Sequence, residues 1–528
     1  MSIGTAIMLS ILAGFAYWTR RFLGDWFLDR PIVVAPITGL IMGDFHLGLI
    51  VGGTLELIFM GATDIGGSVP PNYNIGSILG AAFAISSGQG ISTAVLIAVP
   101  AALLGSFAEL LAKTVSVFFI HAADRMADDG NYKGIARMLH LGNLVHFLAD
   151  AIPTFIALTL GANAVKAIMN DIPHWLQNGI TATGDLLPAL GFALLLSTLA
   201  SPAMFPFYFI GFLLAAYTKM GVLGVAVMAL LVAIVLQSRK PDDDHFDAET
   251  EIAATATTGH GGVLDKKDLR LLWLRSFGLQ SAFSFDRMQA IGFAWAMTPL
   301  LRKIYRNQPQ EFSLALKRHL MFINTNPWVS GPIFAMTADL EIRKALGEQD
   351  IEEQAIQGLK SGLMGPLAGV GDSMFQGTLR PVVAGVMAGL ALQGNPLAPF
   401  LFIAIVNAVH IFVSWYTFKK GFDMGDQFLG VLASGRIRKV MEGATMTGLM
   451  AVGALTATWL TVSTPLTYHV QKATVSLQTM LDGIMPDILP LAATMLVFWL
   501  VRRRFNTTRI MLGMIVVGLV LGSFNIIK

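Results

Sequence analysis

The chain has 528 residues, of which 54% are hydrophobic and 13% are charged, and its mean hydropathy is +0.63. This composition leaves too little polar surface to cover a soluble globule of that size, so it predicts an integral membrane protein. The formal net charge of +2 gives no basis for nucleic-acid binding, and the absence of cysteine excludes disulfides, thiol nucleophiles and thiolate metal sites.

Apolar runs recur along the whole chain. They lie at 31–43, 92–106, 151–162, 187–200, 203–236, 398–413, 489–501 and 510–523. Several are shorter than the roughly 20 residues that a helix needs to cross a bilayer. We therefore expect an all-α, multi-pass membrane protein in which some helices are tilted, broken or re-entrant. The first run, Met1–Tyr17, has no preceding basic residue and no clear cleavage site, so we interpret it as a membrane helix and not as a removed signal.

Residues 1–237 form the first predicted module, which is almost entirely hydrophobic. Its polar interruption at 121–140 must lie outside the bilayer. Residues 238–266 are rich in charge, Thr, Ala and Gly, and such a stretch cannot bury enough apolar surface to offset the entropy of ordering. We predict a flexible linker here, and the neighbouring Lys and Arg residues favour a cytoplasmic position for it.

The second predicted module covers 267–528. In its first part, 269–358, charged stretches alternate with apolar residues spaced three and four apart, which indicates amphipathic helices. Residues 359–528 are predicted to be embedded in the membrane. The periodicity leaves open whether the amphipathic part packs on the first module, lines an entrance or docks a partner.

Each module contains one segment in which glycine, proline and polar side chains interrupt an apolar run, at 52–77 and at 362–381. Irregular backbone at membrane depth survives only where it lines a cavity or is buried in protein, so both segments are candidates for a transport site. Their carboxylates and amides suit the hydroxyls of a sugar. Two further candidate places lie outside these segments, at Gln89 and at the pair Asn324 and Asn326. Together the candidate substrate contacts are Glu56, Asp64, Asn72, Gln89, Asn324, Asn326, Asp372, Gln376, Thr378 and Arg380.

Structural roles compete with a substrate role at several of these positions. Glu56 could bridge neighbouring helices, and Arg380 could be the fixed ion partner of Asp372. Because ionisable groups at membrane depth are costly and usually functional, the transport pathway is favoured for Glu56 and Asp372. Asn324 and Asn326 precede a proline, so they could simply end a helix.

Direct use of ATP is not expected, because no glycine loop of the GxxxxGK[ST] type occurs. The histidines lack a recognisable acid partner at a characteristic spacing, so none of them stands out as a phosphotransfer nucleophile. No cofactor and no metal site are expected.

Several long motifs resemble one known family. PIVVAPITGLIMGDFHLGLIVGGTLELIFMG (31–61) and HAADRMADDGN (121–131) resemble the IIC subunit of mannose–fructose–sorbose family permeases of the phosphoenolpyruvate-dependent sugar phosphotransferase system. The second module resembles the IID subunit of the same family, through KDLRLLWLRS (267–276), SFDRMQAIGF (284–293), KRHLMFINTNPW (317–328) and GLMGPLAGVGDSMFQGTLRP (362–381). The motifs occur in order and cover nearly the whole chain, as in a IIC–IID fusion.

The resemblance implies group translocation in a bacterial inner membrane. A hexose-type sugar would bind between the modules, cross by an elevator-like movement of a core region, and be phosphorylated by a phosphohistidine on a cytoplasmic IIB subunit. The phosphoryl group would come from phosphoenolpyruvate through the general phosphotransferase proteins and IIA. The resemblance also implies a homotrimer of IIC–IID pairs.

Three positions depart from the family pattern. Mannose-type members often have Asn where this chain has Asp64, Asp where it has Asn72, and Trp where it has Gln376. An added acid and a lost aromatic platform suggest a different sugar, such as an amino sugar or a sugar–amine conjugate.

Two other functions fit the sequence. An ion-coupled secondary sugar transporter could use Glu56, Asp64 or Asp372 to carry a proton or sodium ion. A membrane scaffold or receptor would need no defined polar chemistry in either segment.

Overall fold

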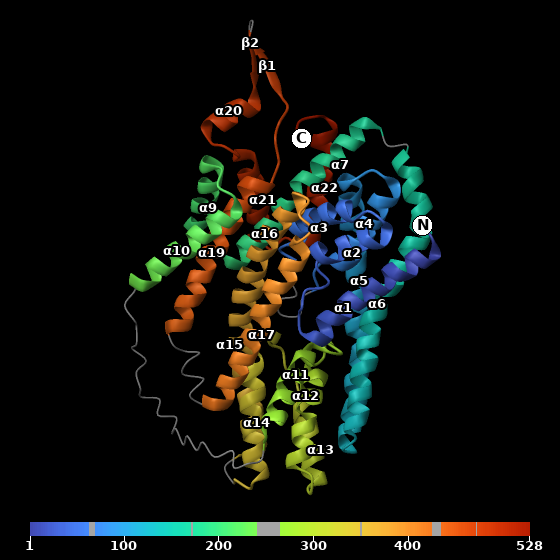
Figure 1. Ribbon diagram of the computed structural model, residues 1–528, viewed down its shortest axis with the longest axis vertical. Coiled ribbons are helices and arrows are strands. Elements are labelled where there is room, and N and C mark those ends of the chain that lie inside the picture. The colour runs from blue at the N-terminus through green and yellow to red at the C-terminus, as the bar shows by residue number, and fades with distance from the viewer. Residues whose placement is uncertain are drawn as a thin grey trace.

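The computed structural model describes residues 1–62, 69–170, 173–239, 264–348, 351–424, 435–470 and 473–527. Helices dominate this part of the chain, as predicted (Figure 1). The exception is a short antiparallel hairpin of β1 (Thr467–Val470) and β2 (Ala473–Ser476), in which Thr467 pairs with Ser476.

The first module contains ten helices in the described ranges. They are α1 (Ile3–Leu23), α2 (Pro31–Met42), α3 (Phe45–Phe59), α4 (Tyr73–Ser87), α5 (Ile91–Asp128), α6 (Tyr132–Asn170), α7 (His174–Leu186), α8 (Pro188–Leu199), α9 (Phe205–Thr218) and α10 (Val222–Arg239). Asp64 falls in 63–68, and the centre of the predicted linker falls in 240–263; both lie outside the described residues.

The second module begins with short helices and continues with long apolar ones. Its elements before the hairpin are α11 (Lys266–Ser276), η1 (Phe277–Gln280), α12 (Ala290–Ile304), α13 (Pro309–His319), η2 (Pro327–Val329), α14 (Gly331–Ala345), α15 (Glu353–Gly371), the π-helical η3 (Asp372–Leu379), α16 (Arg380–Leu392), α17 (Ala398–Met424) and α19 (Gly435–Trp459). The elements after the hairpin are α20 (Leu477–Ile484), α21 (Ile488–Arg502) and α22 (Thr507–Ser523).

Four helical runs among the described residues are long and apolar enough to cross a membrane. They are Ile91–Asp128, Tyr132–Gly161, Glu353–Leu392 and Ala398–Asp423. Helices α20 and α21 meet at an angle of 76° and could form one more bent span. Shorter apolar helices accompany these runs. In helix length and composition, the prediction of a multi-pass helical membrane protein is therefore confirmed.

Helices α5 and α6 reach well beyond a bilayer. With 38 residues, α5 rises about 57 Å at about 1.5 Å per residue, against a hydrocarbon core of about 30 Å. The polar turn between them lies beside α13, at the opposite end of the molecule from the hairpin (Figure 1). Arg287 Nη1 donates to Asp124 Oδ1 at 2.7 Å, and Lys317 forms an ion pair with Asp128. The amphipathic part of the second module therefore packs on the first module.

Glycines allow helices of the two modules to approach closely at membrane depth. A Cβ atom at Gly211 of α9 would overlap the carbonyl oxygen of Met450 in α19, and one at Gly453 of α19 would overlap that of Tyr208 in α9. Small residues permit this contact because their backbones can approach without intervening side chains. The pairs α3–α16 and α7–α22 also join the modules, and one buried apolar cluster extends through both.

A buried charge cluster holds α13, α14 and the C-terminal end of α12 together, outside the candidate spans. Arg318 donates to both carboxylate oxygens of Glu341, at 2.6 and 3.0 Å, and Tyr305 Oη donates to Glu341 Oε2 at 2.7 Å. His319 Nε2 lies 2.9 Å from Glu341 Oε1. Burial alone would raise the pKa of Glu341, but His319 and Arg318 hold that pKa below its ordinary range.

We expect Glu341→Gln to destabilise the protein by roughly 3–5 kcal/mol, because removing one partner leaves the buried Arg318 guanidinium without its counter-ion. The midpoint of thermal unfolding in detergent measures this effect. The matched control is Glu348→Gln, since Glu348 is exposed and pairs with Arg343 at 2.8 Å on the surface. A surface pair contributes about 0–1 kcal/mol. Equal shifts for the two variants would contradict a stabilising role for the cluster.

Acidification should destabilise the protein through His319. Burial lowers the pKa of this imidazole from 6.5 to about 4. Between these two values the unfolded state takes up a proton that the native state does not, so stability falls as the pH falls from 6.5 to 4. We expect His319→Gln to flatten the dependence of the unfolding midpoint on pH in this window. An unchanged pH dependence would show that other groups account for it.

Candidate functional site

A polar pocket lies between the two modules. Its wall is formed by residues of both modules. The first module contributes Arg21, Asp25 and Lys113, and the second contributes Gln280, Phe283, Gln289, Asn324, Thr325, Asn326, Pro327, Ala368, Asp372 and Gln376. Most of these side chains can donate or accept hydrogen bonds. A small polyhydroxylated ligand fits this lining better than an apolar one.

The asparagine-containing loop before η2 is held by a clamp of hydrogen bonds. Thr325 N donates to Gln289 Oε1 at 2.9 Å, and Gln289 Nε2 donates back to Thr325 O at 2.8 Å. Asn326 Oδ1 accepts from Trp328 N at 2.9 Å, while Asn326 Nδ2 donates to Asp372 Oδ1 at 2.8 Å. Asn326 therefore begins a 3₁₀ turn, and does not end a helix as the sequence suggested, and it also lines the pocket.

The π-helix η3 places two of the predicted residues on the pocket wall. Asp372 begins η3 and Gln376 follows one turn later, and both line the pocket. Thr378 Oγ1 donates to the carbonyl of Ser373, five residues earlier, at 2.9 Å. A π-helical turn within an α-helix adds a residue to the turn and is frequent at functional sites.

Asp25 joins the modules across the pocket. Its Oδ2 accepts from Gln280 Nε2 at 3.3 Å and from Gln376 Nε2 at 3.2 Å, while Arg20 Nε lies 3.3 Å from its Oδ1. Asp25 has a φ of +64°, an uncommon conformation for a residue other than glycine. Sequence reasoning missed this residue, although a carboxylate directly after the first apolar run was a signal.

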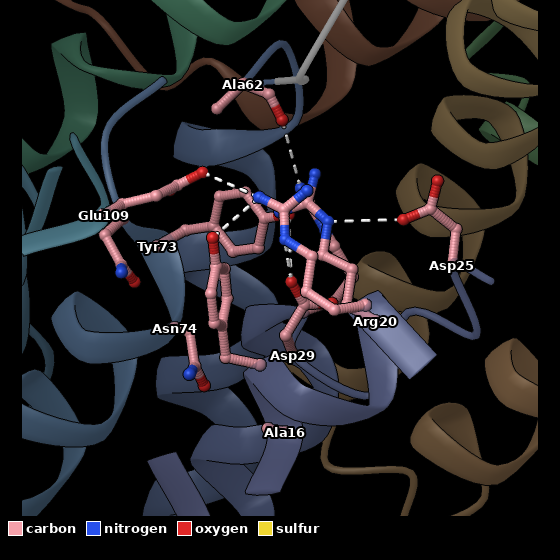
Figure 2. Close-up of polar contacts among 12 residues, drawn as sticks. Ala16, Arg20, Asp25, Asp29, Ala62, Tyr73, Asn74 and Glu109 are labelled. Carbon is pink, nitrogen blue, oxygen red and sulfur yellow. Dashed lines mark hydrogen bonds and ion pairs between the residues drawn. The ribbon is translucent and has the colours of Figure 1, made fainter. Parts of the chain in front are cut away.

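A buried network of charges supports the pocket from the first module. Figure 2 shows Arg20 between Asp25 and Asp29, with Arg20 Nη1 at 3.4 Å from Asp29 Oδ2. Tyr73 Oη also donates to Asp29 Oδ2, at 3.2 Å. Because Asp25 lines the pocket, the conformation of this network sets the position of one wall.

Glu56 takes the helix-bridging role that competed with substrate binding. Its carboxylate accepts from Arg30 Nε at 2.9 Å, from Arg30 Nη2 at 2.5 Å and from Ile32 N at 3.3 Å, and it is fully buried. Arg30 also donates to the carbonyls of Phe59 and Ala62 (Figure 2 labels Ala62). The pair thus ties the start of α2 to α3, and Glu56 is not part of the pocket wall described above.

Asn72 is also held away from this pocket. Its Nδ2 donates to Asp150 Oδ1 at 2.8 Å, and its Oδ1 caps α4 by accepting from Ile75 N at 3.0 Å. Asn74 donates to the other oxygen of Asp150 at 2.6 Å. The carboxylate of Asp150 therefore fixes both asparagines against α6.

The remaining predicted residues lie at different places. Asn324 lines the pocket, Gln89 is exposed between α4 and α5, and Thr378 is buried. Arg380 is buried and donates to the carbonyls of Met60 at 3.0 Å and Gln376 at 3.3 Å. Within the described ranges no ion pair joins Arg380 to Asp372, so that alternative is wrong for this conformation.

Two family models together match nearly the whole chain. Residues 3–235 match the PTS system sorbose-specific IIC component, and residues 263–527 match the PTS system mannose/fructose/sorbose family IID component.

Individual relatives agree with this division. The fructose permease IID component of Bacillus subtilis (strain 168) is 41% identical over 267 residues, which are 48% of this chain and 94% of that protein. The mannose-specific EIIC component of Escherichia coli (strain K12) is 31% identical over 221 residues, or 42% of this chain and 83% of that protein. A chain from the solved complex of the mannose transporter ManYZ with microcin E492 is 37% identical, with a TM-score of 0.30 over 50% of this chain and 98% of that chain.

The chain therefore belongs to the mannose/fructose/sorbose family of phosphotransferase-system sugar permeases, with a IIC component and a IID component joined in one polypeptide.

Proposed function

We propose that this protein carries a hexose-type sugar across a bacterial inner membrane and that the sugar is phosphorylated on arrival by the phosphohistidine of a IIB subunit. The observation that carries the proposal is the pocket lined by polar residues of both modules. The relatives are named as mannose, fructose and sorbose systems, and all three names denote hexoses. IIA would supply the phosphoryl group to IIB.

An elevator-like movement of one part of the protein past the rest would open the pocket to each side in turn. Hydrogen bonds across the pocket, such as those from Gln280 and Gln376 to Asp25, could be exchanged for contacts with substrate.

We also propose a homotrimer. Large apolar side chains are exposed along α5 and α6, and lipid or neighbouring copies must cover them in the membrane. These exposed residues include Leu104, Phe107, Leu111, Phe118, Leu144, Ile152 and Leu160.

The substrate is proposed to be an amino sugar or a sugar–amine conjugate. Of the three departures from the family pattern, Gln376 lies on the pocket wall, Asn72 is bonded to Asp150, and Asp64 lies outside the described residues. Support therefore comes from the carboxylates of Asp25 and Asp372, which face the same pocket as Gln376 and suit an ammonium group.

Uptake into membrane vesicles tests the function. We expect labelled sugar to accumulate as sugar phosphate only when phosphoenolpyruvate, the general phosphotransferase proteins, IIA and IIB are all supplied. A panel of mannose, fructose, sorbose and glucosamine identifies the substrate, and equal or better uptake of the neutral hexoses would argue against an amino sugar. Accumulation of free sugar on an ion gradient alone would instead make the protein a secondary transporter.

Asp372→Asn should raise the KM for uptake by about 10- to 100-fold, because hydrogen bonds to a charged group contribute roughly 1.5–3 kcal/mol. Asn326 can still approach the substituted amide, so the fold should persist. Asp482→Asn is the matched control, since Asp482 is an exposed carboxylate on α20. An unchanged KM for the Asp372 variant, at equal expression, would remove this residue from the proposed substrate site.

A further inference from the structure

Two buried cations form one side of the pocket wall. Arg21 lies in the last turn of α1 and Lys113 lies in the middle of α5, and both line the pocket although their side chains are only 2% and 1% exposed. Arg21 Nη2 lies 3.0 Å from Glu109 Oε1, and Lys113 Nζ lies 2.9 Å from the same oxygen. This trio contains two positive side chains and one negative one.

An aromatic ring of the second module lies beside both cations on the pocket wall. Arg21 Cζ lies 5.2 Å and Lys113 Nζ 5.4 Å from the centroid of the Phe283 ring, which itself lines the pocket. Arg21 Nη2 also donates to Tyr17 Oη at 2.7 Å. Ring and carboxylate contacts thus fix both cations in place before any ligand arrives.

The carboxylates belong to a separate set of contacts. Asp372 is bonded to Asn326, and Asp25 is bonded to Gln280 and Gln376. The pocket therefore carries a positive group of side chains, Arg21 with Lys113, and a second group in which amides contact two carboxylates, of which Asp25 is also paired with Arg20. Carboxylates and amides suffice to bind sugar hydroxyls or an amine. Two buried cations are costly at this depth and are not needed for a neutral or cationic sugar.

A phosphoryl group is the anion that the proposed reaction brings to this pocket. We propose that Arg21 and Lys113 form a phosphoryl-binding subsite, which stabilises the group during its transfer and holds it on the product; this inference rests on the proposed function. Cations fixed beforehand around a transferring phosphoryl group are the usual source of catalysis in such reactions.

The step balances with groups already named. The N–P bond of the IIB phosphohistidine breaks, and an O–P bond forms to a sugar hydroxyl. The hydroxyl proton passes to a pocket carboxylate, Asp25 or Asp372, and then through water to the imidazole nitrogen that loses the phosphoryl group, so that neutral histidine is restored. Arg21 and Lys113 neutralise the charge on the non-bridging phosphoryl oxygens throughout.

Direct measurement of binding distinguishes the phosphoryl-binding subsite from the rest of the pocket. Isothermal titration of the detergent-solubilised full chain with mannose, glucosamine, their 6-phosphates and inorganic phosphate requires no partner protein. For Lys113→Met, and separately for Arg21→Met, we expect about 10-fold or greater loss of affinity for the sugar phosphate, with about the same affinity for the free sugar. Lys113→Arg should retain binding of both. Lys133→Met, at an exposed lysine near the start of α6, is the matched control.

Glu109→Gln provides a second test that does not remove a cation. Its amide oxygen can still accept from Arg21 and Lys113, but one negative charge is lost. We expect the affinity for sugar phosphate to rise several-fold, whereas a purely structural role for the cations would leave it unchanged or lower it.

Coupled uptake completes the test. Lys113→Met should lower the rate of phosphorylation by about 10²-fold with little change in KM, as for the loss of one fixed donor at a developing negative charge. Equal loss of free-sugar and sugar-phosphate binding would overturn the subsite, as would unchanged binding of both. If the wild-type chain never phosphorylates sugar but binds sugar phosphate through these cations, the proposed function fails while the anion subsite remains.

Discussion

The need to pair charges inside a membrane protein governs the centre of this structure. Four arginines and a lysine lie buried near the junction of the modules, and each is held by a carboxylate, a carbonyl or an aromatic ring. An unpaired charge at this depth would cost several kcal/mol, so the end of α1, the start of α2, α3 and α5 are constrained to meet. The pocket depends on this arrangement because Arg20 and Glu109 position Asp25, Arg21 and Lys113.

Close backbone contact provides the second constraint. The modules pack through α3–α16, α7–α22 and α9–α19, and at Gly211 and Gly453 no side chain larger than hydrogen fits without displacement. The same modules also meet through ion pairs from Asp124 and Asp128, near the end of α5, to Arg287, which precedes α12, and Lys317 of α13. Covalent fusion of two such components keeps each at high effective concentration for the other. The contacts therefore resemble those within a single folding unit more than those of a transient complex.

The pocket combines two kinds of chemistry that a simple sugar carrier would not need together. Amides and carboxylates from the second module and from Asp25 suit a polyhydroxylated or amine-bearing ligand, whereas Arg21 and Lys113 suit an anion. The group translocation that we propose would account for both, because its ligand would enter without a phosphoryl group and leave with one. An ion-coupled carrier would account for the carboxylates but not for the cations beside them.

Sequence alone determined the helical membrane class and the family, and it predicted the division into two modules, because apolar runs and long ordered motifs are local properties of the chain. It also predicted Asn324, Asn326, Asp372 and Gln376 as candidate substrate contacts, and these four residues line the pocket. Only the tertiary structure assigned Glu56 to a bond with Arg30 and Asn72 to one with Asp150, and only it added Arg21, Asp25 and Lys113. These roles depend on which side chain of another helix lies opposite, and residue spacing along one helix carries no information about that.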